Sequence, residues 1–223
     1  MFPLKDTQPS YSRPVVTITL IAVNVLVFLF EFSLDPYTRN NFIDYYGLVP
    51  DHFQVSRVFT SMFLHGGWMH VLGNMLFLWV FGDNIEDLLG HGKYLVFYLL
   101  CGVVAALGQT IALPHSTVPM VGASGAIAGV MGAYLVKFPR SRIVTLVFVF
   151  IFITTIEIPA PIILVYWFVI QLFSGLGSIA HTHVSDAGTA FFAHIGGFVA
   201  GMVLVQVMGS SGRYNRRRDR YWE

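Results

Sequence analysis

Charged residues are scarce in this chain: Asp, Glu, Lys and Arg together make up 11% of its 223 residues. Soluble domains usually carry about 25%. Hydrophobic residues reach 55%, which is more apolar material than a single soluble core can bury. The composition therefore excludes an ordinary soluble domain and places the chain in a lipid bilayer.

Cysteine is nearly absent, and the motifs of two protease classes are missing. Cys101 is the only cysteine, which excludes an intramolecular disulfide. The sequence contains no HExxH, the motif of zinc proteases, and no GxGD, the motif of aspartyl intramembrane proteases. His181 and His183 lie in one loop and are weak evidence for a metal site. We therefore expect no metal and no cofactor.

Long apolar runs are what the chain has instead. About 20 apolar residues are needed to cross the hydrocarbon core of a bilayer. The expected helices are 15–33, 68–83, 93–112, 124–138, 160–178 and 190–208. The first run has no small-residue cleavage site after it, so we interpret it as a retained span rather than a signal peptide. The predicted fold class is an all-α polytopic membrane protein, a bundle of six transmembrane helices.

A further apolar run, 143–156, raises the question of a seventh crossing. With the amino terminus inside and six crossings, 11 of the 13 Lys and Arg residues are cytoplasmic, whereas a seventh crossing lowers that number to 6. The positive-inside rule therefore favours six crossings. At 14 residues the run is short for a span, and Glu157 and two prolines follow it, so we expect an interfacial or re-entrant segment.

This topology divides the chain into three parts. Residues 1–14 form a cytoplasmic segment, 15–208 the membrane domain and 209–223 a basic cytoplasmic tail, so both termini are cytoplasmic. The expected location is the plasma (inner) membrane. A basic tail after a membrane span is typical of a topology signal or a contact with anionic lipid, and we expect no nucleic-acid partner.

Four polar residues inside the expected spans fall at a similar depth. Ser124 starts the fourth span, His194 lies near the start of the sixth, and His70 and Asn74 are spaced i, i+4 on the second. All three spans run inward from the outer side in the six-crossing topology. Polar side chains in a membrane face the protein interior and often mark function.

Small residues on two of these spans allow their backbones to approach closely. On the fourth span they are Gly125, Gly129 and Ala133, with a second ladder from Ser124; on the sixth, Gly197 and Gly201 form GxxxG. Such ladders are typical of tightly packed membrane helices. We expect them to bring Ser124 within hydrogen-bond reach of His194.

Each residue alone also has a structural interpretation. A serine in a GxxxG stripe often only packs or bonds to its own helix, and an intramembrane His or Asn often joins helices. Together, however, Ser124 and His194 supply a nucleophile and a base. His70, Asn74 and the backbone N–H of Ser124 can supply donors to a developing oxyanion.

At these residues the sequence closely resembles the rhomboid family of intramembrane serine proteases. The resemblance rests on GASG at Ser124, the HxxxN pair His70/Asn74 and AHIGG at His194, and it covers nearly the whole chain. It implies a Ser124 nucleophile, a His194 general base and an oxyanion hole of His70 and Asn74, without a third acidic member. His65 has an implied structural role.

One position departs from that family pattern. Many members carry an aromatic residue one turn after the serine, packed on the histidine, whereas this chain has Ala128. The orientation of His194 must then come from another residue. Asp186, in the loop before the last helix, is a weak candidate for a third triad member.

The resemblance implies an intramembrane serine endopeptidase that cleaves transmembrane segments of membrane-protein substrates near the outer side of the bilayer. The alternative is a non-catalytic membrane-protein binding or chaperone scaffold of the same fold, which leaves Ser124 idle. A small transporter predicts ionisable residues in mid-span, and the chain has almost none. The expected partners are transmembrane protein substrates and the lipid bilayer.

Overall fold

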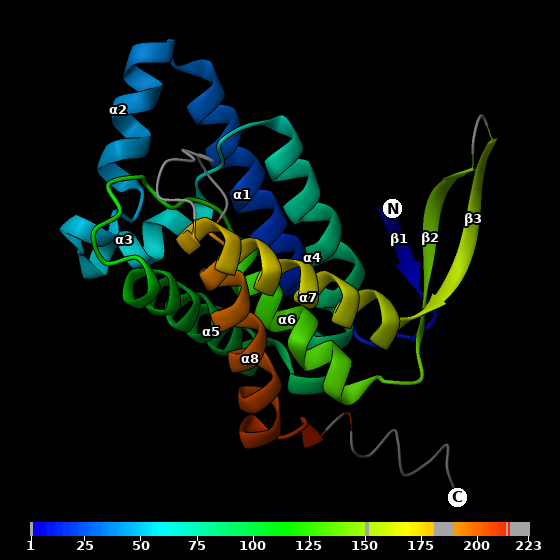
Figure 1. Cartoon of the computed structure of the whole chain (residues 1–223). Coiled ribbons are helices and arrows are strands. Elements are labelled where there is room, and N and C mark those ends of the chain that lie inside the picture. Colours follow the sequence, from blue (N-terminus) through cyan, green and yellow to red (C-terminus); the bar gives the residue numbers. More distant parts are fainter. Residues whose placement is uncertain (1, 150–151, 181–189, 213, 215–223) are drawn as a thin grey trace, which may run out of the picture.

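Helices form most of the structure, a computed structural model that describes residues 2–149, 152–180, 190–212 and 214 (Figure 1). The α-helices of these residues are α1 (Val15–Ser33), α2 (Pro36–Tyr46), α3 (Val55–Thr60), α4 (Trp68–Leu89), α5 (His91–Ala112), α6 (Ser124–Lys137), α7 (Ala160–Ala180) and α8 (Phe191–Met208). Two 3₁₀ turns, η1 (Pro50–His52) and η2 (Ser61–Phe63), flank α3.

Each of the six helices expected from the apolar runs appears, as α1, α4, α5, α6, α7 and α8. Among the described residues, α1, α5 and α8 are long and apolar enough to cross a membrane, and α6 and α7 are apolar over shorter stretches. The protein is an integral membrane protein with a mainly helical fold. The number of six crossings stays a prediction.

The bundle has two ends with different structures (Figure 1). Ser124 and Phe191 start α6 and α8 at one end, which we call the site end. Phe2–Asp6 (β1), Arg142–Val149 (β2) and Phe152–Pro159 (β3) lie at the opposite end, which we call the sheet end, because β2 follows α6 and β3 leads into α7.

Helix α6 lies at the centre of the bundle, and its residues from Gly125 to Tyr134 are buried. The expected close approach of α6 and α8 is confirmed. A Cβ atom added to Gly197 would lie 1.9 Å from the Gly125 carbonyl oxygen, and one added to Gly201 would lie 1.8 Å from that of Gly129. Only hydrogen fits at these positions, so the two backbones are in contact.

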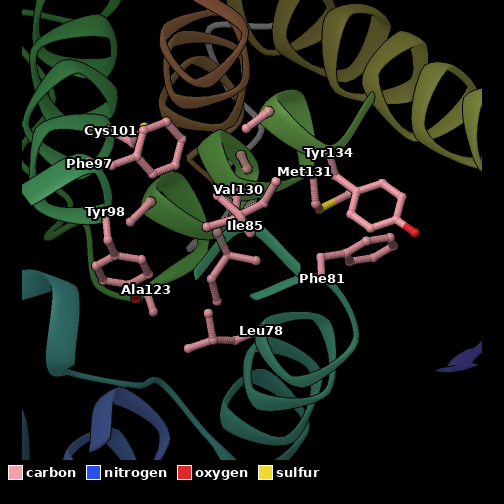
Figure 2. Packing of buried hydrophobic residues seen from close by; sticks show 14 of the residues in the cluster. Leu78, Phe81, Ile85, Phe97, Tyr98, Cys101, Ala123, Val130, Met131 and Tyr134 are labelled. Carbon is pink, nitrogen blue, oxygen red and sulfur yellow. The ribbon is translucent and has the colours of Figure 1, made fainter. Parts of the chain in front are cut away.

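Large side chains fill the space between α6 and the helices on its other faces, α4 and α5 (Figure 2). Phe81 of α4 and Tyr134 of α6 meet edge to face, with ring centroids 5.1 Å apart. Tyr98 and Cys101 of α5 are fully buried in the same cluster. The glycines of α6 therefore lie against both α5 and α8, and its larger residues pack against α4 and α5.

The prediction of an all-α chain is wrong at the sheet end. Strands β1, β2 and β3 form an antiparallel sheet in that order. The apolar run 143–156 supplies most of β2 and of β3, because its β-branched and aromatic residues favour extended structure. An open sheet edge in hydrocarbon would leave backbone groups without partners, which argues against a seventh crossing by this run.

The first residues of the chain, expected only as a polar segment, form strand β1 of this sheet. Lys5 and Asp6 of β1 pair with Val144 and Ile143 of β2. The tyrosine hydroxyl of Tyr134 donates a hydrogen bond to the Asp6 carboxylate. The segment 1–14 is thus attached to α6 and to the hairpin that follows it.

A buried carboxylate joins the start of α1 to the end of α4. Glu86 accepts hydrogen bonds from the backbone N–H groups of Val16 and Thr17 at 2.8 and 2.7 Å, and from the Thr17 hydroxyl at 2.7 Å. These N–H groups have no partner within their own helix, and the carboxylate also complements the positive end of the helix dipole. Glu86 therefore caps α1 from another helix, and it lies in the part of α4 beyond the expected end at residue 83.

Candidate active site

The segment before Ser124 is held by the loop that contains α3. Leu48 and Met120 exchange backbone hydrogen bonds of 3.0 and 2.8 Å, and the Gly122 N–H donates to the Ser61 carbonyl at 2.8 Å. Gly122 has a φ of 122°, which only glycine adopts readily, and an added Cβ atom would lie 2.7 Å from His70 Nε2. The glycine thus permits both the turn into α6 and the close approach of His70.

Ser124 and His194 are in direct contact. Ser124 is the first residue of α6 and His194 lies in the first turn of α8, and the Ser124 Oγ and His194 Nε2 atoms are 2.7 Å apart. This is hydrogen-bond distance for a hydroxyl and an imidazole. The approach of α6 to α8 at their glycines makes the contact possible.

The other ring nitrogen of His194 contacts a residue that the sequence interpretation missed. His194 Nδ1 lies 2.7 Å from Oε1 of Gln171, on α7. An amide oxygen only accepts, so Nδ1 carries the proton and Nε2 is free to accept from the Ser124 hydroxyl. The Trp167 ring, one turn earlier on α7, lies 5.5 Å from the His194 ring.

A polar residue inside the apolar run IILVYWFVIQLF was the available signal for Gln171. The rule that intramembrane polar side chains mark function applies to it as it does to Ser124. Trp167 gives no such signal, because aromatic residues are ordinary in a membrane span.

His70 and Asn74 line the same cavity as Ser124 and His194. The cavity has a volume of about 840 Å³ and is otherwise lined mainly by apolar and glycine residues of α4, α6 and α7. The Gly66 N–H donates to His70 Nδ1 at 3.4 Å, which leaves Nε2 as the protonated nitrogen of a neutral ring. The structure thus brings the four predicted site residues to one cavity, with a donor of His70 near Gly122.

Asn74 is held in place by His65. The Asn74 Nδ2 atom lies 3.0 Å from His65 Nε2, and the His65 backbone N–H donates to the Glu31 carboxylate at 3.3 Å. Burial, with a smaller effect of the neighbouring His70, lowers the pKa of His65 to about 4. The ring is therefore neutral at pH 7 and accepts one amide hydrogen of Asn74, which leaves the second amide hydrogen for the cavity.

The start of α6 has donors of its own. No described side chain caps this helix, whose N-cap residue is Ala123. The first N–H groups of a helix have no partner within it and attract negative charge. These N–H groups start at Ser124, which lines the same cavity as His70 and Asn74.

His181, His183 and Asp186 are outside the described residues. Ala128 is fully buried in α6. No three His, Cys, Asp or Glu side chains gather within the described parts of the chain in a way that would hold a metal ion.

The fold and the cavity define a class: a polytopic helical membrane protein with a serine and a histidine paired in its interior. Comparison with known families specifies this class further. Residues 52–211 match the family model of the Rhomboid domain. The chain therefore belongs to the rhomboid family.

Similar proteins include relatives from bacteria and plants. Rhomboid protease GluP of Bacillus subtilis is 30% identical over 163 residues, which cover 72% of this chain and 28% of GluP. The putative rhomboid protease YdcA of the same organism is 33% identical over 125 residues, covering 55% of this chain and 61% of YdcA. Rhomboid-like protein 11, chloroplastic, of Arabidopsis thaliana is 26% identical over 213 residues, 92% of this chain and 69% of the relative. The matched region spans less than two thirds of both Bacillus proteins.

Proposed function

We propose that this protein is an intramembrane serine endopeptidase in which Ser124 and His194 form the catalytic dyad. The observation that carries the proposal is the 2.7 Å contact between Ser124 Oγ and His194 Nε2, at a cavity that His70 and Asn74 also line. Rhomboid relatives that are named proteases support it.

The chemistry follows from the tautomer of His194. The unprotonated Nε2 takes the Ser124 proton as Oγ attacks the carbonyl carbon of a peptide bond. The resulting imidazolium then gives this proton to the leaving amine, and an acyl-enzyme remains on Ser124. A water molecule, deprotonated by the same nitrogen, attacks the ester and releases the second product.

The negative oxygen of the tetrahedral intermediate needs donors that are already in place. Nε2 of His70 and the free amide hydrogen of Asn74 are suitable side-chain donors, and the backbone N–H of Ser124 is a third. In an apolar cavity such donors stabilise charge more strongly than they do in water.

The substrates we propose are transmembrane segments of other membrane proteins. A peptide bond inside a helix is hydrogen-bonded and shielded, so a cleavable segment should contain small or helix-weakening residues at the depth of Ser124. We further propose six crossings, both termini in the cytoplasm and the site toward the outer side of the plasma (inner) membrane. Topology reporters fused after Arg142 and after Arg218 should both report cytoplasm.

Labelling of the purified protein by a fluorophosphonate tests the proposed activity. Wild type should be labelled and should cleave a transmembrane reporter substrate, and Ser124→Ala should do neither. Ser33→Ala is a matched control, because Ser33 is an exposed helical serine that bonds to the Phe30 carbonyl. A wild-type protein without Ser124-dependent labelling would support the binding or chaperone alternative instead.

A further inference from the structure

The position on α6 one turn after Ser124 is Ala128, which cannot hold the orientation of His194. An alanine side chain offers neither a ring surface nor a hydrogen bond. A histidine that acts as a base must nevertheless keep one tautomer and one ring plane, because rotation would move Nε2 away from the nucleophile. Another element has to supply this constraint.

Helix α7 supplies two contacts to the ring. Gln171 Oε1 accepts from Nδ1 at 2.7 Å, and the Trp167 ring lies against the imidazole at 5.5 Å between centroids and a 41° tilt. The two residues are spaced i, i+4, so they occupy one face of the helix. Gln171 is 8% exposed and is not among the described residues that line the cavity, so a substrate in the cavity does not touch it.

We propose that Gln171 is a positioning residue that fixes the tautomer and the ring plane of His194, together with Trp167, in the place of the aromatic residue that α6 lacks. The inference rests on the proposed Ser124–His194 chemistry. It makes α7 a component of the catalytic unit, because a shift of this one helix removes both contacts from the ring.

The positions of the ring protons before and during the reaction agree with this role. Before the reaction, the single ring proton is on Nδ1, and this N–H donates a hydrogen bond to Gln171. When Nε2 receives the Ser124 proton, the ring becomes a cation with two N–H groups, of which Nδ1–H stays bonded to the amide oxygen. Gln171 therefore never exchanges a proton, and its oxygen stabilises the cation by a charge-assisted hydrogen bond.

Gln171→Met removes the acceptor and keeps a side chain of similar length. A buried donor left without an acceptor is costly, and a wrong tautomer lowers the fraction of competent enzyme, so kcat should fall about ten- to a hundredfold. KM should stay within about twofold, since Gln171 does not reach the substrate. Gln206→Met on α8 is the matched control, because within the described part of the chain the Gln206 amide bonds to the Met202 carbonyl of its own helix at 3.0 Å.

Gln171→Glu provides a readout that a merely structural residue would not move. The carboxylate keeps an acceptor at Nδ1 and favours the charged imidazolium, so the acidic limb of the kcat profile should move to higher pH. The shift is measured against wild type because His70, on α4 across the cavity, titrates in both proteins. Kinetics and thermal unfolding in detergent micelles would be recorded for each variant.

Ring nitrogen NMR of ¹⁵N-histidine protein gives a direct view of the tautomer, with the His194 signal assigned by its loss in His194→Ala. Wild type should show a protonated Nδ1, and Gln171→Met a mixture. A Gln171→Met protein with wild-type kcat, or a Gln171→Glu protein with an unmoved acidic limb, would overturn the inference while wild-type labelling at Ser124 leaves the proposed function intact. If Gln171→Met does not fold, the Gln171→Glu profile decides alone.

Discussion

Polar side chains are buried at both ends of the bundle, but they have different partners. At the sheet end, Glu86 accepts from two backbone N–H groups of α1, and Asp87 accepts from those of Tyr11 and Ser12. At the site end, Ser124 and His194 bond to each other beside a cavity. At the sheet end, buried carboxylates accept hydrogen bonds from the backbone. At the site end, the paired side chains line a cavity.

This difference separates stability from chemistry within one protein. A buried carboxylate that accepts from backbone N–H groups gives these donors a partner. Without it, burial of the N–H groups would cost free energy of folding. A hydroxyl bonded to a neutral imidazole at a cavity can instead exchange its proton with a bound molecule. Substitutions at the sheet end should therefore alter unfolding, and those at the site end should alter turnover.

The largest expected effect is the loss of either dyad member. His194→Ala or Ser124→Ala should lower turnover by about 10⁴-fold or more, because each removes half of one nucleophilic unit. The unfolding temperature should change little, since both side chains face the cavity. Cleavage of a reporter substrate by purified, folded protein is the measurement, and substantial residual proteolysis by Ser124→Ala would contradict the mechanism.

Loss of one oxyanion donor should have an intermediate effect. His70→Phe or Asn74→Leu should lower turnover by about 10²–10³-fold with little change in KM, because the backbone donor remains. Labelling by the fluorophosphonate should slow in parallel, since its phosphoryl oxygen occupies the same place. Asn24→Leu is a matched control, because the amide of this buried asparagine bonds to the Leu20 carbonyl of its own helix at 2.7 Å. Normal turnover in both donor variants would mean that the pair is structural.

Apolar periodicity and small-residue spacing predict the helices and the approach of α6 to α8, because both depend on features repeated along each segment. The β-hairpin after α6 was not predicted as strands. An apolar run of 14 residues fits a short span, an interfacial helix or two strands equally well, and its pairing with β1 depends on residues about 140 positions away. Non-local pairing of this kind leaves no local pattern.

Prediction of the site from the sequence has the same limit, because non-local contacts leave no local pattern. Ser124, His194, His70 and Asn74 stand in motifs with characteristic spacing, so the sequence identifies them. Gln171 belongs to no motif, and its role depends on how α7 lies against α8. A polar residue in an apolar run makes Gln171 a candidate, but its contact with His194 Nδ1 is evident only from the packing of the helices.

Removal of the cap on α1 should lower stability rather than activity. Glu86→Ala leaves the N–H groups of Val16 and Thr17 without their acceptor, which should reduce the free energy of unfolding by at least about 3 kcal/mol. Turnover per folded molecule should stay near that of wild type. Glu157→Ala is the matched control: this exposed carboxylate lies 3.5 Å from Arg142, and its loss should alter stability by less than about 1 kcal/mol. Glu86→Ala with normal stability would mean that the cap contributes little.

The smallest expected effects are pH slopes of opposite sign at the two ends. At the site end, burial lowers the pKa of His65 from 6.5 to about 4, so only the unfolded chain binds a proton between these values. Stability supplied by the neutral ring is therefore lost as pH falls from about 6.5 to 4. At the sheet end, burial raises the pKa of Asp6 above 3.8, so the folded state holds this proton more tightly and stability is lost as pH rises above that value. His65→Gln should flatten the first slope and Asp6→Asn the second, measured as unfolding midpoints from pH 4 to 7. Curves parallel to wild type in both variants would show that neither group couples folding to pH. The two ends would then not differ in the pH dependence of stability.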